Sequence, residues 1–121
     1  MKRVTGIGGI FLKSPDPERL AAWYRTHLGM DIQAWGGAVL ASEGPGEQTV
    51  WSVFPASSDC FAPSSAPFMV NYRVEDLAAL LEILRAEGCE VDPRQETSEF
   101  GAFGWVMDPD GNRVELWQPP V

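Results

Sequence analysis

The second half of the chain repeats the pattern of the first half. In both halves a strand-like apolar segment precedes an amphipathic helix, a glycine and a run of short strand-like segments. Gly9 in the first segment corresponds to Met69 in the later one, and Gly29 after the first helix corresponds to Gly88. Such an internal repeat predicts two copies of one supersecondary unit. Because short strands follow each helix, we expect an α+β fold rather than alternating parallel units.

Each predicted helix has a recognisable start and stop. Asp16 is typical of an N-cap, and Pro17 suits the first helical position. The apolar residues after it recur at helical spacing until Gly29, which favours a helix end. Asp76 predicts the N-cap of the second helix, and Gly88 predicts its end. These signals fix where each half changes from strand to helix and back.

The remaining segments have the pattern of strands and turns. A Pro- and Ser-rich stretch, 55–67, predicts the connection between the halves. We therefore expect one domain over 1–121, with a first module of about 1–57 and a second of about 66–121. The predicted strands are 4–13, two or three within 32–54, then 68–74, 89–96, 102–108 and 112–118.

Charge and cysteine usage exclude several classes of partner. The net charge of −8 and the pI near 4.5 disfavour binding to nucleic acid and to anionic membranes. No apolar run is long enough to cross a bilayer, and the glycine-broken N-terminal segment does not resemble a signal peptide. Cys60 and Cys89 form no metal-binding motif, so free thiols in a reducing compartment are the default. We expect a cytoplasmic protein without a nucleic-acid or membrane partner.

Three stretches together carry a resemblance to a known family: "GIGGIFLKSPDPERLAAWYRTHLGM", "MVNYRVEDLAALLEILRAEG" and "DPDGNRVELW". They resemble the vicinal oxygen chelate superfamily, which includes glyoxalases, extradiol dioxygenases, epimerases, and fosfomycin- and bleomycin-resistance proteins. The resemblance implies a glyoxalase-like fold, in which two tandem βαβββ modules form a cupped, incomplete barrel around the ligand cavity. It also implies a homodimer.

The resemblance places metal ligands at inward-facing positions of the outer and last strands of each half. Here those positions hold Gly9, Met69, a residue near Val50 or Trp51, and Glu115. Glycine has no donor, and a thioether is a poor ligand for hard divalent ions. One carboxylate cannot supply the three or more protein donors that such ions need. We therefore expect no bound metal and no cofactor.

No other catalytic constellation is present in the sequence. The single histidine, His27, falls at the end of the first predicted helix, where capping or packing is its usual role. There is no nucleophile elbow and no phosphate-binding loop. A binding pocket is therefore the better interpretation of the cup.

Strand alternation gives the expected lining of the cup. Side chains two apart along a strand share a face, so the inward direction of the family can be extended along each strand. The result is an apolar and aromatic pocket with a few polar groups, which is typical of a small-molecule site. The candidate ligand-binding residues are Gly9, Phe11, Trp51, Met69, Asn71, Arg73, Arg113, Glu115 and Trp117.

Glu115 is the residue on which the functional interpretation depends. A buried carboxylate needs a partner, and we expect Arg113, Arg73 or Asn71 to hold it. The resulting hypothesis is a metal-free small-molecule-binding module of the bleomycin-resistance type. The alternative is a lyase, epimerase or dioxygenase, either with atypical metal ligands or metal-free with Glu115 as catalytic general base. Whether the protein is an enzyme stays open at this point.

Overall fold

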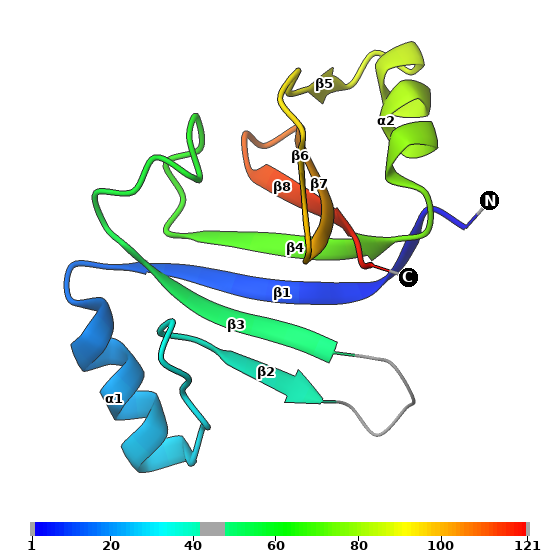
Figure 1. Cartoon of the computed structure of the whole chain (residues 1–121). Coiled ribbons are helices and arrows are strands. Elements are labelled where there is room, and N and C mark those ends of the chain that lie inside the picture. The colour runs from blue at the N-terminus through cyan, green and yellow to red at the C-terminus, as the bar shows by residue number, and fades with distance from the viewer. Residues whose placement is uncertain (1, 42–47, 121) are drawn as a thin grey trace.

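The computed structural model describes residues 2–41 and 48–120, which form an α+β fold with a single eight-stranded sheet (Figure 1). The helices are α1 (Pro17–Leu28) and α2 (Leu77–Ala86). The strands are β1 (Val4–Ser14), β2 (Ala38–Ala41), β3 (Gln48–Pro55), β4 (Phe68–Val74), β5 (Glu90–Val91), β6 (Glu96–Ser98), β7 (Gly101–Met107) and β8 (Arg113–Gln118).

The sheet has the pairing expected of two related halves. Its order is β2-β3-β1-β4-β8-β7-β5, and β6 pairs with β7 beside β5. Within each half the first and last strands are parallel, β1 with β3 and β4 with β8. The halves join where β1 and β4 pair in antiparallel fashion at the centre (Figure 1). The end strands β2 and β5 do not pair with each other, so the sheet is open.

Both helices begin and end near the predicted residues. The Asp16 side chain accepts a hydrogen bond from the Arg19 backbone N–H at 3.1 Å, which caps α1. Gly29 follows α1 in the left-handed conformation, at φ 65°. Asp76 caps α2 in the same way, and Gly88 lies beyond its last turn at φ 85°. Local sequence signals therefore set the helix boundaries.

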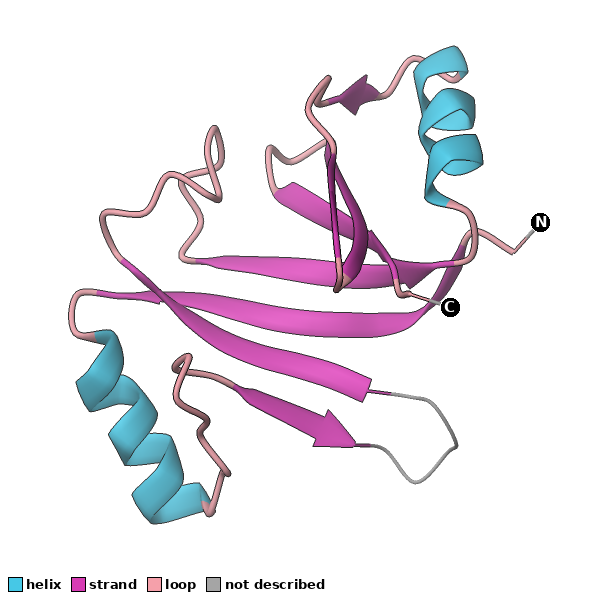
Figure 2. Ribbon diagram, viewed as in Figure 1, coloured by secondary structure: helices cyan, strands magenta, loops and turns pink. Residues whose placement is uncertain are grey.

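The two helices lie at opposite ends of the sheet (Figure 2). Their residues are buried to different extents. The inner face of α2 packs against β4 and β8 and buries Leu77, Leu80 and Leu81. In α1 only Ala21 is buried, whereas Trp23 and Leu28 are 50% and 61% exposed. The stronger apolar core therefore belongs to the second half.

The connection between β3 and β4 contributes to the core between the halves. Phe61 in this connection is fully buried and packs with Phe11, Met69 and Trp105 from three different strands. The predicted loop is thus confirmed as a connection, but one that supplies a core side chain.

No helix in the described part of the chain is long and apolar enough to cross a membrane.

The first half has two strands after α1 among its described residues, β2 and β3, which agrees with the two or three that were predicted. The chain before β2 turns tightly, since the Gln33 N–H donates to the Gly37 carbonyl at 2.8 Å and Gly36 has φ 92°. This turn leads from α1 into the first of these strands. Residues 42–47, within the predicted strand region, lie outside the described residues.

Candidate functional site

A cavity of about 520 Å³ lies against the central strands and is the candidate ligand site. Its volume falls within the roughly 300–1,000 Å³ that is usual for small-molecule pockets. Most of its wall is apolar and aromatic, with side chains from strands of both halves. The apolar wall consists of Phe11, Trp35, Val39, Val50, Phe100, Phe103 and Trp117. We call this space the main cavity.

One wall of the main cavity is a pair of stacked rings. Phe103 on β7 and Trp117 on β8 are register partners, and their rings are parallel within 6° at a centroid distance of 6.1 Å. The Trp117 indole N–H donates to the Phe100 carbonyl at 2.7 Å, which fixes the ring in place. The pair presents a flat aromatic surface against which a planar ligand can lie.

Three polar side chains from neighbouring strands form one buried hydrogen-bond network. Asn71 on β4 and Trp105 on β7 are both register partners of Glu115 on β8. Asn71 Nδ2 donates to Glu115 Oε1 at 2.7 Å, and Trp105 Nε1 donates to Glu115 Oε2 at 2.9 Å. Both carboxylate oxygens therefore have a donor. Glu115 remains 8% exposed and Asn71 only 2%.

The environment of Glu115 makes ionisation of its carboxyl group less favourable than it is in water. Burial raises the pKa of this carboxyl group above its ordinary value. The hydrogen bonds from Asn71 and Trp105 and the positive charge of Arg113 oppose this shift only in part, and Glu96 adds to it. Glu115 therefore carries its charge at an energetic cost that the two donors reduce.

Asn71 also has an atom without a partner, and that atom lies at the main cavity. Its Oδ1 is buried and has no hydrogen bond. The neighbour of Oδ1 on β1 is Gly8. This residue lies in a β-bulge, because the register between β1 and β4 shifts between Ile7 and Gly9. A Cβ on Gly8 would stand 2.0 Å from Asn71 Oδ1 and 2.8 Å from the Trp117 ring, and all three residues line the main cavity. Because Gly8 has no side chain, Oδ1 can occupy the place that a Cβ would take, beside the Trp117 ring.

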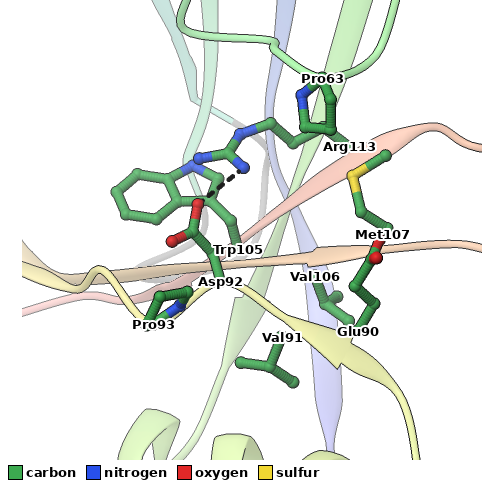
Figure 3. Close-up of a pocket in the computed structure, with 9 residues that line it drawn as sticks. All are labelled: Pro63, Glu90, Val91, Asp92, Pro93, Trp105, Val106, Met107 and Arg113. Atoms are coloured by element: carbon green, nitrogen blue, oxygen red, sulfur yellow. Dashed lines mark hydrogen bonds and ion pairs between the residues drawn. The ribbon is translucent and has the colours of Figure 1, made fainter.

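Asn71, one of the three expected partners of Glu115, holds its carboxylate, and neither arginine donates a hydrogen bond to it. The Arg113 guanidinium instead donates to Asp92 Oδ2 at 3.0 Å and lies over the Trp105 ring, beside a separate hollow of about 190 Å³ (Figure 3). The pKa of Asp92 is lowered, first by the backbone N–H of Arg94 and then by Arg113. Arg73 donates to the Gln48 carbonyl instead. Of the three expected partners of Glu115, only Asn71 contacts it.

The other predicted lining residues are divided among different surfaces. Phe11, Asn71 and Trp117 line the main cavity, whereas Met69 and Glu115 line an adjoining hollow of about 210 Å³. Phe103 borders both spaces and lies between the two sets of residues.

Two predicted positions are displaced by one residue. Trp51 faces α1, with its ring 4.7 Å from that of Tyr24, and Val50 faces the main cavity instead. The inward-facing residue of β3 was assigned one position too late, and neighbouring residues of a strand point to opposite faces. On β1, Gly8 rather than Gly9 lines the main cavity, because the bulge adds one residue there.

Sequence reasoning missed the role of Trp105. The turn at Asp108–Gly111 joins β7 and β8, and counting outward from it pairs Trp105 with Glu115. That register and strand alternation were both readable from the sequence, so the indole N–H could have been named as a partner. The position of Trp35 in the cavity wall, by contrast, had no local signal.

The donors in this site do not fit a metal ion. Glu115 is the one ligand residue at the positions where the resemblance predicts metal ligands, and both of its oxygens already accept hydrogen bonds. Within residues 2–41 and 48–120, no three His, Cys, Asp or Glu side chains lie close enough to hold a metal. Divalent ions in proteins need three or more such donors. That the protein binds no metal in solution stays a prediction.

The comparisons with solved structures concern the fold. The chain is similar to methylmalonyl-CoA epimerase from Mycobacterium tuberculosis, with a TM-score of 0.71 and 21% identity over 100% of this chain and 92% of that one. A Streptomyces coelicolor methylmalonyl-CoA epimerase variant in complex with 2-nitronate-propionyl-CoA has a TM-score of 0.75 at 14% identity, over 98% and 99%.

A third similar structure is a glyoxalase/bleomycin resistance protein/dioxygenase superfamily member from Vibrio splendidus 12B01. Its TM-score is 0.63 at 14% identity, over 93% of this chain and 97% of that one. At these identities the likeness establishes the fold and not the reaction. No curated protein matches the chain. The sequence model described as glyoxalase-like domain matches residues 9–117, and the chain therefore belongs to that family.

Proposed function

We propose that the protein binds a small, largely apolar molecule with a flat ring system in the main cavity, without using a metal ion. The size and aromatic wall of the cavity support this proposal. The stacked pair of Phe103 and Trp117 supplies a surface for a planar ring. Binding would cover apolar surface that is otherwise open to solvent, which favours association.

The observation that carries the proposal is the unpartnered oxygen of Asn71. A buried acceptor without a hydrogen bond costs about 1–3 kcal/mol of stability. A side chain retained at that cost, at the base of an apolar cavity, is explained if a ligand supplies the missing donor. The same atom would orient the ligand, because the rest of the wall is mainly apolar.

A second candidate function is proton transfer with Glu115 as catalytic general base. Its raised pKa favours this, because a base in an apolar site is matched to removing a proton next to a carbonyl group. Against it, both carboxylate oxygens are engaged, and Glu115 borders the small hollow rather than the main cavity. Exchange of such protons with deuterium oxide, lost in Glu115→Gln, would support the second candidate over the first.

The binding function is tested by filling the cavity. Calorimetric titration with two-ring aromatic compounds should show saturable binding to the wild-type protein. Val50→Phe places a larger side chain in the cavity wall and should weaken that binding at least tenfold. Val4→Phe, at the exposed start of β1 and away from the cavity, is the matched control and should bind as the wild type does. Absence of binding by every two-ring compound would contradict the proposed function.

A further inference from the structure

We infer that the main cavity selects neutral ligands that present an N–H or O–H donor to Asn71, and that Glu115 determines this selection by fixing the orientation of the Asn71 amide. This inference rests on the proposed binding function and deepens it. It concerns the chemical class of the ligand and a positioning role for a residue that does not touch the ligand.

The orientation of the amide follows from the hydrogen-bonding capacity of its neighbours. At a pH above its raised pKa, Glu115 is an ionised carboxylate that only accepts, so the Asn71 group 2.7 Å from Oε1 must then be the NH₂ group. Glu115 cannot turn away, because Trp105, whose indole only donates, holds the other oxygen at 2.9 Å. Asn71 therefore presents its oxygen, and not its nitrogen, to the opposite side.

The opposite side is the space beside Gly8 in the main cavity. A Cβ at Gly8 would lie 2.0 Å from Asn71 Oδ1, so any other residue there would displace this atom from its place at the cavity wall. The Trp117 ring, which also lines the cavity, lies next to the same place. A planar ligand lying along the stacked rings would thus bring a donor at its edge to the oxygen.

The charge around this point specifies a neutral ligand. A ligand carboxylate would place an acceptor against an acceptor, with the buried charge of Glu115 directly behind Asn71. The net charge of −8 further disfavours anions. A cation would lose its hydration in an apolar cavity, where Glu115 is too deep to contact it. Aromatic N–H compounds and hydroxyarenes are the class that meets these conditions.

The test uses three bicyclic probes of the same size: indole, which only donates, 1-indanone, which only accepts, and indene, which does neither. Calorimetric titration of the wild-type protein should show indole binding about tenfold more tightly than indene, since one net hydrogen bond is worth about that factor. 1-Indanone should bind no more tightly than indene.

Glu115→Gln provides the decisive variant. The glutamine side chain must offer its oxygen to the Trp105 indole N–H, so its NH₂ group faces Asn71. This NH₂ group cannot accept a hydrogen bond from Asn71. Asn71 then turns its oxygen to position 115 and its NH₂ group to the cavity. The preference should reverse, with 1-indanone bound about tenfold more tightly than indole. Glu75→Gln, an exposed acid-to-amide change outside the cavities, should keep the wild-type preference.

A second variant keeps the inference testable if Glu115→Gln does not fold. Asn71→Leu removes the acceptor while keeping a side chain of similar size, so indole and indene should bind equally. Circular dichroism melting establishes that each variant is folded. If all three probes bind the wild-type protein equally, the inference is overturned while the proposed function stands. An unchanged preference for indole in Glu115→Gln overturns it as well, and no binding by any probe overturns both.

Discussion

The amide nitrogen of Asn71 lies 2.7 Å from Oε1 of Glu115, although the two residues are 44 positions apart in the sequence. They meet because β4 and β8 run parallel in a register that pairs them directly. Trp105 lies in the same row on β7 and donates a hydrogen bond to the other carboxylate oxygen. The network therefore links β8 to both of its neighbours, β4 and β7, and it ends at the unpartnered oxygen of Asn71.

Removing the Glu115 carboxylate should destabilise the fold. Glu115→Ala leaves the donors of Asn71 and Trp105 buried without acceptors, so the free energy of unfolding should fall by roughly 3 kcal/mol. Glu115→Gln keeps two hydrogen bonds after the Asn71 amide turns, so its loss should stay below about 1 kcal/mol. Urea unfolding measures both. Equal losses in the two variants would contradict a role of these hydrogen bonds in stability.

The raised pKa of Glu115 predicts a specific dependence of stability on pH. The folded protein binds this proton more tightly than the unfolded chain, so the contribution of Glu115 to the free energy of unfolding falls as pH rises through the folded pKa. It is recovered as pH falls towards the ordinary carboxyl range. Asp92 and Asp108 have lowered pKa values and act in the opposite sense at lower pH.

The Glu115 contribution can be isolated by difference. The wild-type protein should gain stability relative to Glu115→Gln as pH falls from neutral into the acid range, because the other groups are common to both. Denaturant unfolding at a series of pH values measures this difference. A difference that is constant with pH would show that Glu115 titrates normally.

Chelation should not affect the protein. Both carboxylate oxygens of Glu115 already accept hydrogen bonds, and the described side chains around them do not form a metal-binding set. EDTA should therefore leave the melting temperature and the binding of indole unchanged. Elemental analysis of purified protein should find no stoichiometric zinc, nickel, manganese or iron. A metal present at one equivalent, or a melting temperature lowered by EDTA, would contradict this prediction.

The bulge on β1 predicts a contrast between two glycines. Gly8→Ala places a methyl group against Asn71, whose short side chain is held by Glu115, and should cost about 1–3 kcal/mol of stability and most of the indole binding. Gly6→Ala meets only the flexible guanidinium tip of Arg73, at 2.6 Å, and should be tolerated. Thermal melting and titration of both variants test this. Similar behaviour of the pair would show that Gly8 has no special role.

The fold was largely predictable because its signals are local. The caps at Asp16 and Asp76 were confirmed, and so was the alternation of β8, whose Val114 and Leu116 pack in the α2 core while Glu115 and Trp117 line the hollows. Cytoplasmic location and the homodimer stay predictions.

The partners within the site were predictable only in part. Arg113 pairs with Asp92, 21 residues away, and this contact depends on how the segment after α2 returns to β7. The bulge at Gly8 shifts the face of one residue, and no periodicity in the sequence shows where a bulge occurs. Side-chain alternation therefore identified the right strands, whereas single positions required the tertiary register.

The unequal burial of the two helices has a consequence for local opening. Segments with few buried apolar contacts exchange their amide hydrogens at a lower free energy than the core does. Amides of α1, where only Ala21 is buried, should therefore exchange well before those of α2 around Leu80 and Leu81. Mass-spectrometric deuterium uptake resolves the two helices in one experiment. Slow uptake throughout α1 would mean that another surface covers Trp23 and Leu28 in solution.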